Sequence, residues 1–531
     1  MPIPLESHYD VIISGCGPCG ASFANFLGLY EVSTLIIDRE AEVLNIPRAV
    51  GMCDEGSRIL ESAGVFEHAT IDLLAMSRTN FANVQHKVVF HYDMNKRINE
   101  QPMQRMFYQP QLERGIRNAF QRFSCIDFSP STELRAFNDS HDGVIVELDQ
   151  EGVTKTVRGR FLIACDGASS PVRKQLGIGF SGTTYEQDWL IIDVGKNPLE
   201  SDEVCFLMDP QRPGVTMPLP LNKRRWEFVV KSDDNIEDLS SDSTIRDLLS
   251  HWGNFDDMQL ERKAIYTFHA RTAERFSKGN VFLAGDAAHI TPPFAGQGMM
   301  AGLRDAQNLA WKLAGVIDGR LDQKILNSYS AERVEQCKQV IKMAQFIGNI
   351  VLPQNTVKVW LRNVFLKLLT VTGLYSEQKG FTVDKIPNHI NGRLFRHFWI
   401  NKTRGTGAWF PQFPLTQGKD TKPSDAWIDS SYHIISWGSD AELGETTRQR
   451  WRDLGGKLFA LGSNTQSANN PTLLADISGE FEKFFGNKHC VVIRPDKMIV
   501  IKCTHAKLES KLNAYLDSVC SLAATGQEYR T

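Results

Sequence analysis

The chain has 531 residues, of which 42% are hydrophobic and 23% charged, and its formal net charge is −3. That composition predicts a globular protein of two or three domains, and the lack of a basic run argues against nucleic-acid binding. The first residues, MPIPLESHYD, lack the pattern of a secretory signal, no stretch reaches the roughly 18 apolar residues of a membrane-spanning helix, and ten scattered cysteines predict free thiols in a reducing cytoplasm.

The first predicted elements form a β-α-β unit around the sequence GCGPCG at residues 15–20. Residues 9–14, YDVIIS, predict a buried parallel strand, the residues after Gly20 a helix, and residues 33–37 a second strand. Read by its glycines, GCGPCG is the G-x-G-x-x-G loop of a dinucleotide-binding site. Read by its cysteines, it is the C-x-x-C of a thioredoxin-type redox centre.

The glycine interpretation accounts for more of the surrounding residues. Gly15 permits the tight turn, Gly17 lets the backbone approach a pyrophosphate, and Gly20 lets the helix pack closely on the strand. The second strand ends in an acid where a carboxylate can reach a ribose hydroxyl, and a redox centre requires neither this acid nor the outer glycines. The alternative is a glycine-rich structural turn. The predicted cofactor-binding residues of this unit are Gly15, Gly17, Gly20, Asp38 and Arg39.

Cys16 and Cys19 then fill positions that suit small residues. Buried cysteine behaves as a small hydrophobic residue. We therefore predict that these two thiols form no working redox pair.

Two later strands end in carboxylates beside glycine. Residues 160–165 run into Asp166-Gly167 and the pattern D-G-x-x-S-x-V-R, and residues 280–284 run into Gly285-Asp286. Asp286 is suited to accept a hydrogen bond from a ribityl hydroxyl, although a helix cap or a turn would also explain either acid. A helix begins soon afterwards, and its N–H groups can face the negative charge of a reduced flavin. The residues expected at that helix start are Gly296, Gln297 and Gly298.

The middle and the C-terminal part of the chain differ in pattern. Residues 179–279 are rich in β-type runs such as WLIIDV and RRWEFVVK. Residues 356–371 predict a helix, packed in the protein or lying on a membrane surface. A stretch near 400–424 is typical of a linker, and the segment from 425 onward predicts a β-α-β unit, a hairpin and a final helix.

The three motifs, in this order, resemble the single-component FAD-dependent aromatic hydroxylases with the p-hydroxybenzoate hydroxylase-like fold. The resemblance is to the 3-(3-hydroxyphenyl)propionate hydroxylase branch and covers nearly the whole chain. Besides the three motifs, it is carried by PRAVG at 47–51 with Asp54-Glu55, YQPQLE at 108–113, YSAER at 329–333, and the stretches ACDGASSPVRKQL and RDAQNLAWKLA.

The resemblance implies an α/β protein with a Rossmann-like FAD-binding domain of the glutathione reductase type, an inserted antiparallel-sheet substrate domain and a C-terminal thioredoxin-like domain. The expected FAD-binding domain comprises 1–75, 104–178 and 280–350, and the substrate domain 76–103 and 179–279. A helical segment at 351–400, a linker at 401–424 and the thioredoxin-like domain at 425–531 follow. The first strand of this last domain leads to Trp437-Gly438-Ser439-Asp440 without a cysteine pair, so we expect a structural or dimerisation module.

The resemblance also implies the chemistry. NADH or NADPH would reduce FAD, O2 would add at the flavin C4a atom, and the hydroperoxide would hydroxylate a small phenolic substrate without a metal. Arg48 and Gln109 would lie near the flavin ring and ribityl chain, Asp166 on the pyrophosphate or NAD(P)H side, and Pro292 and Pro293 over the ring where oxygen adds. His289 receives no role. Stable membrane insertion is not expected, and a homodimer is compatible with the family.

Two alternatives stay open at this point. One is a hydroxylase of a heteroaromatic ring, of quinolone or pyridine type, on the same fold. The other, from another class, is a non-catalytic binding protein built on thioredoxin folds, for which C-G-P-C would be the functional motif. Bound flavin distinguishes the second alternative from the flavoprotein, and a panel of substrates distinguishes the first.

Overall fold

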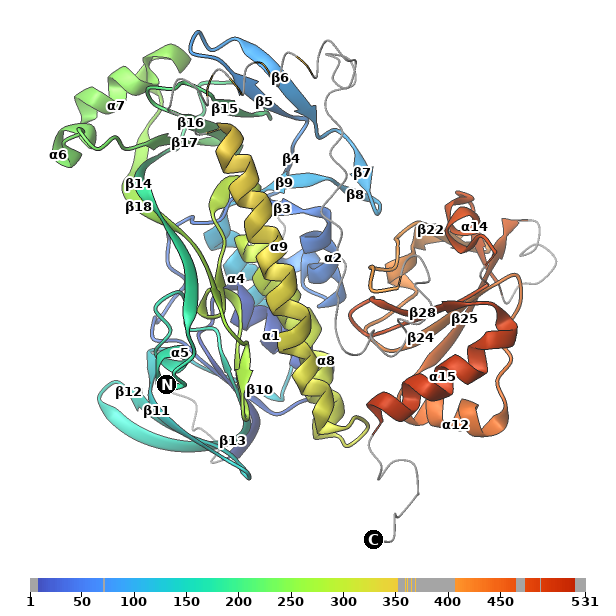
Figure 1. Cartoon of the computed structure of the whole chain (residues 1–531). Helices are drawn as coiled ribbons and strands as arrows, with labels where there is room; N and C mark the ends of the chain where they lie inside the picture. Colours follow the sequence, from blue (N-terminus) through green and yellow to red (C-terminus); the bar gives the residue numbers. More distant parts are fainter. Residues whose placement is uncertain are drawn as a thin grey trace.

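Figure 1 shows the computed structural model of the protein. The structure describes residues 8–69, 72–351, 406–464, 473–487 and 489–520, together with the single residues 359, 361, 364 and 368. The predicted helical segment 351–400, including the helix at 356–371, lies outside the described residues apart from Val351 and those single positions.

The first sheet has a parallel core in which β2, β20 and the last four residues of β1 and of β13 are buried. Its strand order is β10-β2-β1-β13-β12-β11, and β20 pairs with β13 on a branch. The pairs of β1 with β2, β1 with β13, β2 with β10 and β13 with β20 are parallel, so their carboxyl ends meet at one edge. The strand bounds are β1 His8–Ser14, β2 Thr34–Ile37, β10 Ile126–Ser129, β11 Thr132–Ser140, β12 Gly143–Gln150, β13 Val153–Ala164, β19 Ser277–Lys278 and β20 Val281–Leu283.

Helices that carry the expected motifs pack on this sheet. Helix α1 starts directly after the glycine-rich turn, and it packs against α8, a helix buried along nearly its whole length. Figure 1 shows α9 running beside α8, between the two sheets and the C-terminal domain. The helix bounds are α1 Pro18–Leu29, α2 Asp54–Ser62, α3 Phe66–Ala69, α4 Gln109–Phe120, α5 Pro171–Gln175, α8 Gly298–Ile317 and α9 Asn327–Val351.

The second sheet is mostly antiparallel and has the order β21-β18-β14-β17-β16-β15-β5-β6. Segment 76–103 supplies its outer strands, because β5 pairs in parallel with β15. The strand bounds are β5 Arg78–Ala82, β6 Val88–Asp93, β14 Phe180–Val194, β15 Val204–Leu207, β16 Gly214–Leu219, β17 Lys223–Val229, β18 Leu260–Ala273 and β21 His289–Ile290. Smaller pairings are made by β3 Gly51–Cys53, β4 Leu74–Ala75 and β9 Gln104–Met106, and by β7 Arg97–Ile98 with β8 Gln101–Pro102.

The two faces of the second sheet contact different parts of the protein, because successive side chains along a strand point to opposite faces. One face packs under α6 (Ile236–Leu239) and α7 (Asp242–Leu249), where Leu190 and Trp226 join Ile245 in an apolar cluster. The opposite face carries Asp193 and Arg225, which are paired across β14 and β17. Arg225 donates hydrogen bonds to the backbone carbonyls of Pro47 and Arg48, so this face contacts the loop of the first domain.

The C-terminal domain contains a third sheet, with the order β23-β22-β26-β25-β24-β27-β28. The expected linker at 401–424 is wrong in part, because β22 and β23 fall within it and β22 pairs with β26. All four residues of β23 are exposed, so this edge hairpin lacks the apolar alternation by which a strand is recognised. The bounds are β22 Pro414–Gln417, β23 Asp420–Pro423, β24 His433–Trp437, α12 Glu445–Asp453, β25 Lys457–Ser463, β26 Leu474–Asp476, α14 Glu480–Phe485, β27 Cys490–Ile493, β28 Ile499–Cys503 and α15 His505–Val519.

Buried polar contacts join the C-terminal domain to the first domain. Arg58 of α2 pairs with Asp425 at 2.8 Å and donates to the carbonyl of Phe410 at 2.9 Å. Tyr30 and Arg320 donate to the carbonyls of Ser430 and Leu454 at the rim of a cavity of about 820 Å³ between the domains. Within the described residues, none of the helices has the length and hydropathy that crossing a membrane requires.

Candidate active site

The turn after β1 leaves room for a phosphate. A Cβ on Gly20 would lie 2.0 Å from the Gly15 carbonyl oxygen, and one on Gly15 would lie 2.4 Å from the Cys165 carbonyl oxygen, so both positions require glycine. Gly17, in contrast, has no neighbouring atom within 4 Å of where its Cβ would stand. Helix α1 starts at Pro18 with no side-chain cap and no acid in its first turn. Its N-terminus therefore presents free N–H groups and positive dipole charge to the open space beside Gly17.

Asp38 is held against this turn at the end of β2. Its Oδ2 atom accepts the backbone N–H of Cys16 at 2.8 Å and an Arg117 N–H at 3.2 Å. Arg117 is fixed in turn by Glu113, one turn earlier on α4, at 3.0 Å. A carboxylate has lone pairs for further donors, so these contacts orient Asp38 and leave it able to accept a ribose hydroxyl. Arg39 is exposed and pairs with its neighbour Glu40.

The two cysteines of the turn pack as small residues. Cys16 is fully buried, and burial raises the pKa of its thiol. Cys19 lies 3.8 Å from the Cys165 sulfur, and that hydrogen bond together with burial raises the pKa of the Cys19 thiol. Both are free thiols. Because the thiolate is the reactive form, this environment supports the prediction that they form no redox pair.

The second motif joins the turn to the rest of the site. Asp166 Oδ2 accepts the Val172 N–H at 3.2 Å at the start of α5, while its Oδ1 atom is buried without a hydrogen-bond partner among the described residues. Burial raises the pKa of the Asp166 carboxyl. Arg173 donates to the carbonyls of Ala168 and Ala287 at 2.9 and 2.8 Å, so it ties this motif to the Gly285-Asp286 loop.

Asp286 is exposed in the turn that follows β20, although Gly285 before it and Ala287 after it are buried. Desolvation by the surrounding protein raises the pKa of the Asp286 carboxyl, and the positive charges of His289 and Arg48 oppose this rise. A Cβ on Gly285 would lie 3.1 Å from the Cys19 Cβ atom, so the third motif touches the first.

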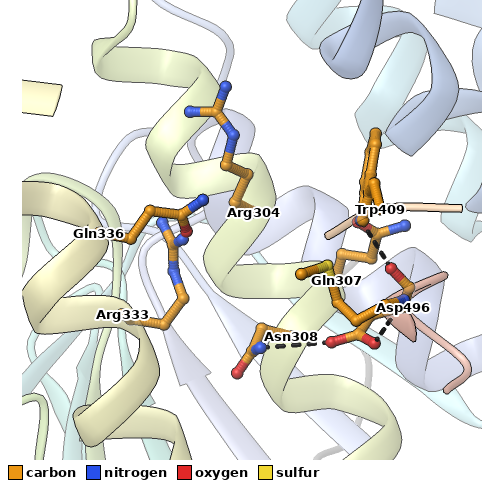
Figure 2. Close-up of a pocket in the computed structure, with 8 residues that line it drawn as sticks. Arg304, Gln307, Asn308, Arg333, Gln336, Trp409 and Asp496 are labelled. Atoms are coloured by element: carbon orange, nitrogen blue, oxygen red, sulfur yellow. Dashed lines mark hydrogen bonds between the residues drawn. The ribbon is translucent and has the colours of Figure 1, made fainter. Parts of the chain in front are cut away.

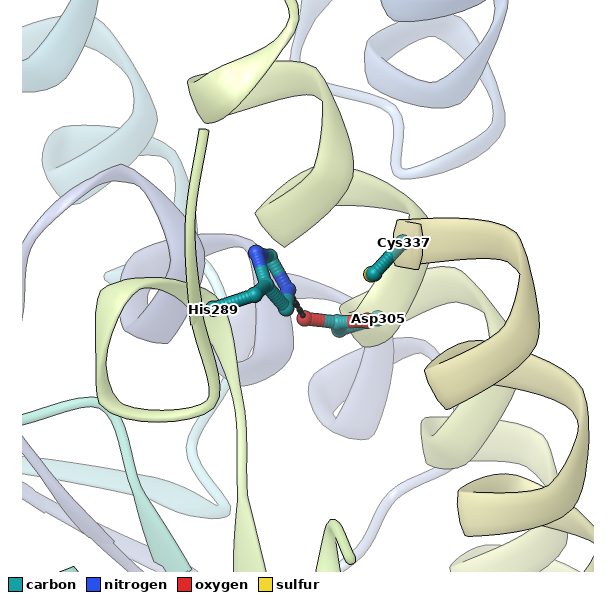
Figure 3. A group of neighbouring side chains, drawn as sticks. All are labelled: His289, Asp305 and Cys337. Atoms are coloured by element: carbon teal, nitrogen blue, oxygen red, sulfur yellow. Dashed lines mark hydrogen bonds and ion pairs between the residues drawn. The ribbon is translucent and has the colours of Figure 1, made fainter. Parts of the chain in front are cut away.

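A buried ion-pair network supports this loop, and Figure 3 shows its His289–Asp305 pair. Asp305 of α8 accepts the Gly285 N–H at 2.9 Å and His289 Nε2 at 2.7 Å through Oδ2, and Arg333 Nε at 2.6 Å through Oδ1. Burial lowers the pKa of His289, but the Cys337 sulfur and the Asp305 carboxylate outweigh it and raise the pKa to about 10. His289 is therefore a charged structural partner of Asp305.

Three residues of this network form the one group of potential metal ligands found among the described residues. The ligand atoms of His289, Asp305 and Cys337 lie within 4.8 Å of one another. However, Arg333 already supplies the positive charge, since it contacts both Asp305 and the Cys337 sulfur, the latter at 3.7 Å. The donor set is thus matched to a guanidinium, and a metal ion would have to displace it.

Gln109 and Arg48 meet on the side of the second sheet. Gln109 is buried at the start of α4, and its Oε1 atom accepts the backbone N–H groups of Arg48 and Ala49 at 2.9 and 2.7 Å. On the other side, Arg225 pairs with Asp193 at 2.6 Å and donates a hydrogen bond to a backbone carbonyl of the same loop. The loop is therefore fixed on both sides, and the Arg48 side chain is left exposed.

The segment just before α8 packs against an aromatic cluster of the second sheet. Pro292 is buried and Pro293 exposed. Phe294, between them and α8, packs edge-on against Phe268 and Tyr185 of the second sheet and at a tilted angle against Trp189. Gly296 has φ +60°, the left-handed conformation that favours glycine. Gln297 caps α8 with its backbone while its side chain accepts an Arg304 N–H at 2.8 Å, and Gly298 is the first residue of the helix.

These features fit FAD. The open space beside Gly17 suits the pyrophosphate, the buried and unpartnered Asp166 Oδ1 suits a donor, and the exposed Asp286 suits a ribityl hydroxyl. Sequence reasoning did not assign the residues that hold these groups in place: Arg117, Arg173, Arg225, Asp305 and Arg333. Three of them, Arg173, Asp305 and Arg333, lie in stretches that carry the family resemblance, ACDGASSPVRKQL, RDAQNLAWKLA and YSAER, which is the signal that could have indicated them.

Comparison with known proteins agrees with this site. The family "FAD binding domain" matches residues 8–344, and the family "HcaD C-terminal domain" matches residues 407–518. The 3-(3-hydroxy-phenyl)propionate/3-hydroxycinnamic acid hydroxylase of Burkholderia cenocepacia (strain HI2424) is 31% identical over 95% of this chain and 96% of that protein. The protein of the same name from Klebsiella pneumoniae (strain 342) is 32% identical over 98% and 96%.

Solved structures show the same fold. Aklavinone-11 hydroxylase in complex with FAD and aklavinone covers 97% of this chain and 100% of its own, with a TM-score of 0.77 and 21% identity. The flavin-dependent monooxygenase PieE, solved with FAD and substrate, has the same coverage, a TM-score of 0.76 and 18% identity. The thioredoxin-type interpretation of GCGPCG finds no support, because these residues lie inside the FAD-binding match. The chain belongs to the family of FAD-dependent aromatic hydroxylases, in the branch of the 3-(3-hydroxyphenyl)propionate hydroxylases.

Proposed function

We propose that the protein uses NAD(P)H and O2 to add one hydroxyl group to a phenolic ring that carries a carboxylate-ended side chain, as in 3-(3-hydroxyphenyl)propionate. The observation that carries this proposal is the identity of 31–32% over nearly the full length with hydroxylases of that name. The bound FAD would supply hydride acceptance from NAD(P)H and oxygen activation.

The chain's own residues would bind the cofactor and exclude water. The α1 N-terminus and Asp38 would hold the pyrophosphate and ribose, Asp286 the ribityl chain, and the α8 N-terminus with Gly296 and Gly298 the negative edge of the reduced ring. Arg48, whose positive charge acts on Asp286, would contact the ring side of the ribityl chain, with Gln109 fixing the Arg48 backbone.

The substrate would lie between Pro292-Pro293 and the inner face of the second sheet. The cluster of Trp189, Phe268 and Phe294 makes this wall apolar, which keeps water from the reacting atoms. An apolar aromatic wall also suits a heteroaromatic ring of similar size, so that substrate class is the second candidate.

The C-terminal domain is inferred to be thioredoxin-like and without thiol chemistry. Its strands β25-β24-β27-β28 combine one parallel pair, β24 with β25, and two antiparallel pairs. The position after β24 holds Gly438-Ser439-Asp440 and no cysteine pair. All ten cysteines of the protein are free, which supports a reducing compartment such as the cytoplasm.

The test is substrate-stimulated oxidation of NADH and NADPH, with the product identified by mass spectrometry. The panel contains 3-(3-hydroxyphenyl)propionate, 3-hydroxycinnamate, phenol without a side chain, and a hydroxypyridine and a quinolone as heteroaromatics. The expected result is one added oxygen on the phenolic acids, with phenol turned over less well. Hydroxylation of a heteroaromatic alone would replace the substrate class, and a protein that binds no FAD would overturn the whole proposal.

A further inference from the structure

Two consecutive residues of α9, Glu332 and Arg333, serve different neighbours. Arg333 points toward the flavin-binding loop, where it pairs with Asp305 at 2.6 Å. Glu332 points toward the C-terminal domain, where its two oxygens accept Arg494 N–H groups at 2.8 and 3.1 Å. Both α9 residues and Arg494 are at most 1% exposed. Helix α9 is thus held between a residue of the C-terminal domain and the support of the cofactor loop.

The contact from the C-terminal domain is made by the turn between β27 and β28. Arg494 also pairs with Asp496 of the same turn at 2.5 Å, and Asp496 accepts an N–H of Asn308 on α8 at 3.3 Å. Figure 2 shows Asp496 and Trp409 facing α8 and α9 across a cavity of about 20 Å³, room for about one water. The turn therefore contacts α8 through Asn308 and α9 through Glu332.

The buried charges around Glu332 are balanced only while all of its charged partners are present. Burial would raise the pKa of Glu332, but Arg494 and Lys312 outweigh burial and lower the pKa to about 2. Lys312 pairs with Glu332 at 3.0 Å and is itself fully buried. Removing one member of such a buried set leaves an under-compensated charge on the helix that carries it.

We propose that Arg494 is a positioning residue for the flavin-binding loop. Through Glu332 it fixes α9, so that Arg333 holds Asp305, and Asp305 holds the Gly285 N–H and His289. The C-terminal domain thereby sets the shape of Gly285-Asp286 without touching the cofactor. This inference rests on FAD binding at that loop, and it does not depend on which aromatic substrate is hydroxylated.

The experiment compares Arg494→Gln with Tyr30→Phe and Arg320→Gln in the full-length protein. The two controls also remove hydrogen bonds between the same two domains, at 2.9 and 3.1 Å, but from residues outside α9. FAD affinity is measured by titrating apoprotein with FAD and following the flavin fluorescence, and the melting temperature by circular dichroism. Arg494→Gln is expected to weaken FAD binding about tenfold or more, and the controls less than about twofold.

A double variant tests the path itself. If Arg494 acts through Arg333, the effects of Arg494→Gln and Arg333→Gln on FAD affinity are not additive. The double variant then binds FAD about as tightly as the single variant that has the lower FAD affinity. Arg494→Lys keeps one positive charge at Glu332 and is expected to lie between wild type and Arg494→Gln, which provides a measurement if the glutamine variant does not fold.

Two results would overturn the inference. One is wild-type FAD affinity in both Arg494 variants. The other is an equal loss of affinity in Tyr30→Phe and Arg320→Gln, which would show that domain contact in general is responsible. In either case wild-type FAD binding and hydroxylation remain, so the failure is distinguishable from failure of the proposed function.

Discussion

The cofactor domain and the C-terminal domain each contain a strand, a loop, a helix and a second parallel strand, yet the helix starts differ. In the first, β1 leads to α1, whose N-terminus has no cap and no acid and faces the open space beside Gly17. In the second, β24 leads to α12, where the Gly444 N–H donates to the Glu509 carboxylate at 3.0 Å. The Thr447 hydroxyl donates to the same carboxylate at 2.7 Å.

The difference is where the anion comes from. A helix N-terminus attracts negative charge, and in the C-terminal domain the protein supplies that charge itself through Glu509 and through Glu445 in the first turn of α12. At α1 the position is left for the cofactor phosphates. Similar local topology therefore gives a binding site in one domain and a closed structural unit in the other.

The largest expected effect comes from Gly20→Ala. A Cβ there would lie 2.0 Å from the Gly15 carbonyl, a backbone atom that cannot move away, so FAD affinity should fall about 100-fold or more. The matched control is Gly444→Ala, whose Cβ would meet the end of the flexible Glu509 side chain at 2.7 Å. FAD titration of both apoproteins checks this, and equal affinities would remove the distinction between the two helix starts.

The next effect concerns the carboxylates that follow the strands. Asp286→Asn removes the charge at the exposed position near Arg48 and should reduce FAD affinity about tenfold, as expected for a charged hydrogen-bond acceptor. The control is Asp440→Asn, which changes an exposed aspartate after β24 and should leave FAD affinity unchanged. The ratio of absorbance near ~450 nm to that of the protein, measured after desalting, reports bound flavin. An Asp286→Asn protein as yellow as wild type contradicts the role of Asp286.

A stability measurement tests the N-terminus of α12, where Glu509 supplies the negative charge. Glu509→Ala removes the acceptor for the Gly444 N–H and the Thr447 hydroxyl, and should destabilise the C-terminal domain by about 1 kcal/mol, as for the loss of a helix cap. Urea unfolding followed by tryptophan fluorescence gives the change, and FAD affinity serves as the control that should not move. A loss of flavin at unchanged stability would mean that α12 has a binding role.

The smallest effect is expected for Cys16→Ala combined with Cys19→Ala. Both thiols are packed and protonated, because burial raises the pKa of Cys16 and the contact with Cys165 raises the pKa of Cys19. Substrate-stimulated NAD(P)H oxidation should change less than about twofold. Loss of turnover in a folded, flavin-loaded double variant would restore a redox role for these cysteines.

The sequence predicted those parts of the site that depend on local backbone chemistry. The turn at Gly15, Gly17 and Gly20 requires residues without a side chain, and the acid at the end of the second strand follows directly from the order of the residues, so both could be expected from the sequence alone. FAD as cofactor and the membership of the hydroxylase family are confirmed by the comparisons.

Long-range contacts could not be predicted in the same way. Arg225 lies far from Pro47 in the sequence, and Arg494 far from Glu332, yet each pair is in contact in the structure. A buried arginine leaves no periodic signal, since its partner is set by tertiary packing. The strands at 414–423 were missed for a related reason, because an exposed edge hairpin has no apolar face to mark it.

The pairing of β5 with β15 has a consequence for synthesis. Thr79 finds its partner Val204 only after the intervening chain has left the ribosome, and β18, which joins that sheet beside β14, comes later still. Until then the nascent protein exposes unpaired strand edges, which are prone to aggregate. Cells that make this enzyme are thus expected to need chaperone capacity during its translation, and slower elongation before β18 should lower the yield of native protein.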